Sequence, residues 1–183
     1  MAYQTKISEW RFHGKAFDVR QDDVLLPTGK VKTLDIVVHT AAVTILPVDS
    51  EGNIWFVRQY RQPAGLELLE LPAGTLEVGE NPIKCAKREI QEEIGMAAGR
   101  LTKLGEFFMT PGYSTEYMYV YLAEDLTSSP LEADEDEFLT IEKKKIKDAY
   151  VDARNGKILD SKSMVALFLA QPCLLPTSKE TTK

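Results

Sequence analysis

Three glutamates lie close together in the segment KREIQEEIG, residues 87–95, and their spacing is the first sign of chemistry in this sequence. Glu92 and Glu93 follow Glu89 by three and four positions, which makes them neighbours on the surface of a helix. Like charges at this spacing destabilise an exposed helix by roughly 0.2–0.5 kcal/mol per pair. A divalent cation would remove this repulsion, because Mg²⁺ binds carboxylate oxygens. The pattern therefore indicates either a solvated acidic face or a cation site.

A loop of small residues lies upstream of the acidic helix. The segment Leu71-Pro72-Ala73-Gly74 follows a predicted strand and leads by a short connection into the helix. Mg²⁺ also accepts backbone carbonyls, keeps several waters and takes further ligands from substrate phosphates. The loop and the helix together therefore predict a partial metal site that a phosphorylated ligand would complete.

Residues 74–96 read GTLEVGENPIKCAKREIQEEIGM and are similar to the Nudix box of hydrolases that cleave nucleoside diphosphates linked to another moiety. That box is a glycine, five residues, a glutamate, seven residues and then Arg-Glu-apolar-x-Glu-Glu-x-Gly-apolar. Every constrained position matches, namely Gly74, Glu80, Arg88, Glu89, Ile90, Glu92, Glu93, Gly95 and Met96. Chance is a poor explanation for a match of this length.

The resemblance to the Nudix box implies a role for each acidic residue. Glu89 and Glu93 are the implied main metal ligands, Glu92 a further or bridging ligand, and the carbonyl of Ala73 completes the set. The same three glutamates are the implied catalytic residues, and Arg88 is expected to pair with a carboxylate and orient the cluster. The implied metal is Mg²⁺, with Mn²⁺ as the alternative. The implied fold is the Nudix α/β/α sandwich around a mixed sheet.

The segments that flank the box resemble those of ADP-ribose pyrophosphatases. RQYR at 58–61 resembles their Arg-Gln-x-Arg segment, ELPAG at 70–74 their Glu-x-Pro-Ala-Gly segment, and Pro111-Gly112 the Pro-Gly that follows the box. This resemblance implies metal-dependent hydrolysis of ADP-ribose to AMP and ribose 5-phosphate. One alternative is another sugar nucleotide, GDP-mannose or ADP-glucose. An alternative from a different class is a module that binds ADP-ribose without cleaving it, but such modules usually lose box glutamates.

Four residues outside the box are predicted to bind substrate. Arg61 is expected to contact the diphosphate or terminal ribose, because a guanidinium matches phosphate with two parallel hydrogen bonds. Arg58 and Glu70 belong to the two flanking segments, and His39 is expected to reach substrate across a dimer interface. The alternatives are a surface arginine on a strand and a structural histidine.

An acidic run at residues 132–137 is the predicted source of the general base. In ADP-ribose pyrophosphatases a loop at this place supplies a glutamate that activates water. Glu137, next to Phe138, and Glu135 are the candidates here, and their spacing does not distinguish them. A solvated loop is the alternative interpretation.

The elements that carry these residues mix strands and helices without regular βαβ alternation, which favours an α/β sandwich. Residues 1–40 are predicted as an antiparallel β arm exchanged across a dimer, 41–175 as the hydrolase domain and 176–183 as a flexible tail. Asn81-Pro82 is predicted to begin the acidic helix as its N-cap and first residue, and Gly95 or Gly99 to end it. Two later helices are expected, at 147–155 and 161–171.

Composition limits the classes of partner. The 183 residues carry a formal net charge of −6, which argues against nucleic-acid and anionic-membrane partners. The two cysteines form no CxxC pair, so zinc-site and disulfide frameworks are poor interpretations. We therefore expect a cytoplasmic location. The resemblance to ADP-ribose pyrophosphatases implies a homodimer that acts on a small nucleoside diphosphate sugar.

Overall fold

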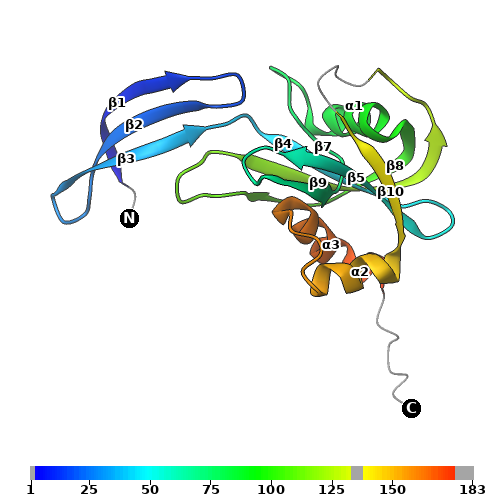
Figure 1. Ribbon diagram of the computed structural model, residues 1–183. Helices are drawn as coiled ribbons and strands as arrows, with labels where there is room; N and C mark the ends of the chain where they lie inside the picture. Colours follow the sequence, from blue (N-terminus) through cyan, green and yellow to red (C-terminus); the bar gives the residue numbers. More distant parts are fainter. Residues whose placement is uncertain (1–2, 133–137, 176–183) are drawn as a thin grey trace, which may run out of the picture.

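The computed structural model describes residues 3–132 and 138–175 (Figure 1). The elements in chain order are β1 (Gln4–His13), β2 (Asp18–Leu25), β3 (Val31–Val38), β4 (Ala42–Pro47), β5 (Asn53–Arg61), β6 (Leu66–Glu70), β7 (Ala73–Thr75), α1 (Pro82–Ile94), β8 (Met96–Phe108), β9 (Tyr117–Ser128), β10 (Thr140–Lys145), α2 (Ile146–Arg154) and α3 (Ser161–Leu174). The two later helices are thus confirmed, although α2 begins one residue earlier than expected and α3 ends three residues later.

Two sheets form the centre of the molecule. The first has the order β7-β4-β9-β8, in which β4 and β9 are parallel and the other neighbours antiparallel. The second is antiparallel, with the order β10-β5-β6. Helix α1 lies on one side of these strands, and α2 and α3 lie on the other (Figure 1). The expected α/β/α sandwich with a mixed sheet is confirmed.

The central strands are buried on both faces. In β4, Val43 and Ile45 pack with Ile90 of α1, whereas Leu46 joins a separate cluster that includes Leu167 of α3. This division follows from the strand period of two, which sends successive side chains to opposite faces. It also explains why β4 is apolar at every position except Thr44 rather than alternating.

Helix α1 begins and ends at residues whose local chemistry favours helix ends. The side chain of Asn81 accepts a hydrogen bond from the backbone N–H of Ile83 at 2.9 Å, and Pro82 takes the first helical position. Gly95 ends the helix with a φ of 69°, a left-handed conformation that glycine adopts without steric cost. The predicted start is confirmed, and of the two predicted ends Gly95 is the correct one.

Strands β1, β2 and β3 form a separate antiparallel sheet that projects from the rest of the molecule (Figure 1). The arm is joined to the main body where Val37 exchanges backbone hydrogen bonds with Tyr113 and Thr115, at 2.7 and 3.0 Å. All of β1 is exposed, including the large apolar side chains of Trp10 and Phe12. No helix in the described parts of the chain is long and apolar enough to cross a membrane.

Candidate active site

A cavity of about 790 Å³ opens between α1, β5, β6, the loop at β7 and the start of α3. Six of the residues predicted from the sequence line it, namely His39, Arg61, Glu70, Ala73, Glu89 and Glu93. The fold thus brings the carboxylates of the box and the basic flanking segment to one cavity.

Glu89 lies directly against the backbone of Gly74. A Cβ atom at position 74 would be 1.9 Å from the carboxyl carbon of Glu89, so no residue with a side chain fits there without moving the carboxylate. Glycine is required here for close approach rather than for an unusual φ angle. The box glycine therefore makes room for one of the predicted metal ligands.

Glu93 connects the helix to the loop. The backbone N–H of Ala73 donates a hydrogen bond to Oε2 of Glu93 at 3.1 Å. Both Glu89 and Glu93 are largely buried, with 8% and 9% of their surface exposed. Hydrogen bonds to ionised carboxylates are roughly twice as strong as those between neutral groups, so this bond fixes the loop relative to α1.

Arg88 lies among the other acidic side chains of the box. Its Nη1 donates to Glu89 at 2.7 Å and to Glu92 at 2.9 Å, and its Nη2 donates to Glu80 at 3.1 Å. The hydrogen bond to Glu80 raises the pKa of Arg88, and the same contact lowers the pKa of Glu80. Arg88 thus pairs with carboxylates as predicted and offsets part of the repulsion that the spacing of the glutamates indicated.

The donor set suits a hard divalent cation. Glu89, Glu93 and Ala73 line the cavity and offer carboxylate and carbonyl oxygens, whereas Glu92 is held beside it by Arg88. Among the residues that the structure describes, no three acidic, histidine or cysteine side chains are already placed to hold a metal ion. The oxygens of Glu89, Glu93 and Ala73 could supply part of a coordination shell, as suits an ion that also takes waters and substrate oxygens.

The end of the cavity formed by β5, β6 and the start of α3 contains Arg61 and Glu70. Nε and Nη2 of Arg61 donate to the two carboxylate oxygens of Glu70, at 2.8 and 2.7 Å. Glu70 is only 2% exposed and also accepts a hydrogen bond from Lys162. Burial alone would raise the pKa of Glu70, but the hydrogen bond from Arg61 and the charge of Lys162 outweigh it and hold this pKa below its usual value. Glu70 was predicted to bind substrate, and its side-chain contacts in the structure are with Arg61 and Lys162.

Lys162 and Asp160 also line the cavity, and neither was predicted as a site residue. One sequence signal could have identified Lys162. It lies in the first turn of α3, where the helix dipole disfavours a cation. A lysine at such a position therefore indicates a partner outside its own helix.

The structure separates the two arginines of the RQYR segment. Arg58 donates to Glu142 of β10 at 2.6 and 3.2 Å and does not line the cavity. Residues three apart on a strand point to opposite faces, so Arg58 and Arg61 cannot both face the same cavity. His39 does line it, with its Nδ1 2.6 Å from the carbonyl of Thr40.

The two predicted base candidates, Glu135 and Glu137, lie outside the described residues. Their placement relative to the cavity is therefore a prediction from the sequence.

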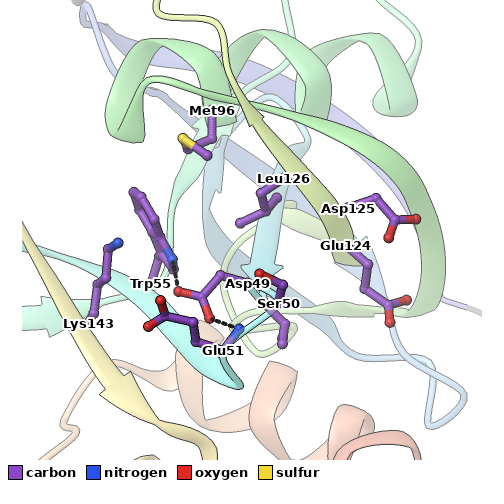
Figure 2. Close-up of a pocket in the computed structure, with 10 residues that line it drawn as sticks. Asp49, Ser50, Glu51, Trp55, Met96, Glu124, Asp125, Leu126 and Lys143 are labelled. Carbon is purple, nitrogen blue, oxygen red and sulfur yellow. Dashed lines mark hydrogen bonds between the residues drawn. The ribbon is translucent and has the colours of Figure 1, made fainter.

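A second hollow, of about 450 Å³, lies beside Trp55 and contains several acidic side chains (Figure 2). Its central carboxylate, Asp49, accepts hydrogen bonds from the indole of Trp55 at 2.9 Å and from the backbone N–H groups of Glu51 and Asn53. Burial alone would raise the pKa of Asp49, but these bonds outweigh it and lower the pKa to about 2. Lys143 covers the Trp55 ring at 3.7 Å. The hydrogen bonds of Asp49 thus hold the turn between β4 and β5, which is a structural role. The larger cavity, which contains the box carboxylates, is therefore the candidate site.

The chain resembles known proteins over most of its length. The sequence model of the NUDIX domain matches residues 38–162. The "ADP-ribose pyrophosphatase" of Bacillus subtilis (strain 168) is 39% identical over 166 residues, which cover 90% of each chain. The "Methanol dehydrogenase activator" of Bacillus methanolicus is 35% identical over 162 residues, 87% of this chain and 88% of that one. A crystal structure of an "ADP compounds hydrolase" superposes with a TM-score of 0.86 over 95% of each chain at 24% identity, a likeness of fold.

Proposed function

The chain belongs to the Nudix family and is a Nudix pyrophosphohydrolase, and we propose that its substrate is ADP-ribose, which it hydrolyses to AMP and ribose 5-phosphate. One observation carries the proposal. A single cavity presents the buried box carboxylates Glu89 and Glu93 from α1 and the cation Arg61 from β5. A bound diphosphate needs both features. The metal ion that accompanies it requires carboxylate ligands, and its negative charge requires a cation such as a guanidinium. The similarity to the Bacillus subtilis enzyme supports the choice of substrate.

Nudix enzymes generally require divalent metal ions, and the ion proposed here is Mg²⁺, with Mn²⁺ as the alternative. Glu89, Glu93 and the carbonyl of Ala73 would hold it, with Glu92 as a further ligand once Arg88 releases it. When bound, such an ion neutralises charge on the diphosphate and lowers the pKa of the attacking water.

The remaining roles belong to side chains of this chain. Arg61 directs one edge of its guanidinium to Glu70, so its Nη1 edge binds a diphosphate or ribose oxygen. Arg88 keeps Glu89 in place against Gly74. Glu135 or Glu137 takes the proton from the attacking water. The variants Glu135→Gln and Glu137→Gln identify the base. Only the one that removes the base should abolish the acidic limb of the pH–rate profile.

The experiment that tests the substrate is product analysis with ADP-ribose, GDP-mannose and ADP-glucose, each with Mg²⁺ and with EDTA. We expect AMP and ribose 5-phosphate to form fastest from ADP-ribose and only with metal. Faster cleavage of another sugar nucleotide would keep the site and replace the substrate. Binding of ADP-ribose without cleavage of any substrate would favour the non-catalytic module.

The arm supports a proposed homodimer. β1 is exposed along its whole length and presents Ile7, Trp10 and Phe12 to solvent, although large apolar side chains are usually buried. A second copy that receives the arm would cover them and would bring His39 near a substrate shared between copies. Light scattering should give twice the chain mass of 20.6 kDa, and Trp10→Ser should shift the equilibrium to monomer. A monomeric wild-type chain would contradict the exchange.

The proposed location is the reducing cytoplasm. Both cysteines are free, Cys85 in the interior and Cys173 at the surface. Cell fractionation with antibodies against the chain tests this location.

A further inference from the structure

Lys162 occupies an unusual place for a lysine. It is 8% exposed, it lies in the first turn of α3, and it forms ion pairs with Glu70 and, at 3.0 Å, with Asp160. Burying an ammonium is costly unless it is paired, and the start of a helix disfavours positive charge. Its charge is therefore stabilised by Glu70 and by Asp160, the N-cap of α3, and not by the helix dipole.

Glu70 passes the effect of Lys162 on to Arg61. Oε2 of Glu70 accepts from Lys162 and from Nη2 of Arg61, while Oε1 accepts from Nε of Arg61. A guanidinium has five N–H donors in a fixed plane, so engaging this edge leaves the Nη1 edge for a ligand. The orientation of that edge depends on the carboxylate, and Lys162 holds this carboxylate through Oε2, the oxygen that also accepts from Nη2 of Arg61.

Lys162 also balances the charge at this end of the cavity. Without it, Arg61 alone would face the two carboxylates of Glu70 and Asp160, which would repel an anionic ligand. With it, two cations and two anions alternate, and Arg61 can interact with a phosphate without competition from unpaired carboxylates.

The start of α3 is fixed to the strand that carries Glu70. The backbone N–H of Leu71 donates to the hydroxyl of Ser163 at 2.7 Å, and the N–H of Ser163 donates to Asp160 at 3.0 Å. Leu71 follows Glu70 directly, and Ser163 follows Lys162 directly. The bond between Leu71 and Ser163, next to the ion pair of Glu70 and Lys162, thus holds these two side chains at a constant separation.

We propose that Lys162 is a positioning residue: acting through Glu70, it orients Arg61 for the diphosphate and so determines substrate affinity. This inference rests on the proposed function for its ligand, ADP-ribose, and for the contact of Arg61 with the diphosphate.

The test compares steady-state kinetics of wild type, Lys162→Met and Lys162→Arg with ADP-ribose and Mg²⁺. We expect Lys162→Met to raise KM about tenfold and to leave kcat within about threefold, the size of effect that loss of one charge-assisted hydrogen bond produces. Lys162→Arg keeps the charge and the donors, so it should return KM to within about threefold of wild type.

Two further comparisons separate positioning from other roles. Lys157→Met is the matched control, because Lys157 pairs with Asp152 at 2.8 Å on the surface and does not line the cavity; its KM should not change. In an Arg61→Ala background, Lys162→Met should change KM by less than about twofold, because no guanidinium remains to be oriented. Additive effects on KM, or a lower kcat with an unchanged KM, would overturn the proposal.

Thermal unfolding of each variant identifies a folding defect. If Lys162→Met does not fold, the double variant Glu70→Gln/Lys162→Met removes both buried charges and is compared with Glu70→Gln alone. Equal KM values for these two variants support the proposal, and a tenfold difference contradicts it.

If the wild type cleaves another sugar nucleotide, the same series is run on that substrate. Calorimetric binding of ADP-ribose in EDTA gives the affinity order without turnover, so failure of the proposed function and failure of this inference remain distinguishable.

Discussion

The two ends of the cavity contain the same kind of contact, an arginine between carboxylates, but differ in charge balance. At the α1 end, Arg88 faces Glu80, Glu89 and Glu92, with Glu93 one turn away. At the α3 end, Arg61 and Lys162 face Glu70 and Asp160. The first end has an excess of negative charge and suits a cation, whereas the second is balanced. The difference shows that the kind of ion each end can bind depends on its net charge, not on its number of ion pairs.

The largest expected effect tests the acidic end. Glu93→Gln keeps an acceptor for the N–H of Ala73 but removes a ligand charge. We expect kcat with Mg²⁺ to fall about 10³-fold, because charge stabilisation by a metal is worth several kcal/mol. The melting temperature should be unchanged or higher, because one like charge is removed. Glu92→Gln, outside the cavity, should cost less, and equal losses would contradict the division between lining and supporting glutamates.

A second change tests the close approach at the acidic end. Gly74→Ala places a Cβ within 1.9 Å of the Glu89 carboxyl group, so we expect activity to fall about tenfold to a hundredfold and stability to fall by about 1–3 kcal/mol. Gly112→Ala is the control, since a Cβ there meets no atom within 4 Å. Urea unfolding and kcat measure both effects. An active Gly74→Ala enzyme would show that Glu89 need not occupy its present position.

The balanced end is tested by the two arginines of one strand. Arg61→Ala should raise KM for ADP-ribose about 10- to 100-fold, because a charge-assisted contact to phosphate is lost. Arg58→Ala removes an arginine of the same strand that pairs with Glu142 instead, and it should change KM less than about threefold. A larger effect for Arg58→Ala would place substrate on the other face of β5.

The smallest effect concerns the second hollow, which should contribute to stability only. The pKa of Asp49 is lowered from 3.8 to about 2 in the folded chain. Its stabilising contribution is therefore complete above about pH 4 and is lost as pH falls through about 2. Asp49→Asn should lower stability at pH 7 by less than about 1 kcal/mol, because the group is close to solvent. Activity of this variant should equal that of wild type, and a loss of turnover would connect the hollow to catalysis.

Much of the acidic end could be predicted from the sequence. The spacing of Glu89, Glu92 and Glu93 has the helical period, Asn81-Pro82 begins the helix, and Gly95 ends it. These features are local, since each depends on atoms within a few residues, and local geometry follows from the covalent chain. The Nudix box also identified the family, and the family implied the α/β/α sandwich.

Tertiary structure decided which side chains meet at the other end of the cavity. Lys162 and Glu70 are 92 residues apart, and no spacing in the sequence predicts that their side chains meet. Likewise, only the folded structure shows which face of β5 borders the cavity, and this face carries Arg61 rather than Arg58. The thirteen-residue strand β8 was not predicted, because its small and polar residues have no strong β pattern and it is held by pairing with β9. The sequence by itself determined the local acidic site on α1. Only the packing of α3 against the sheet determined how Arg61 is held, because contacts between residues far apart in the sequence form only when the whole core assembles.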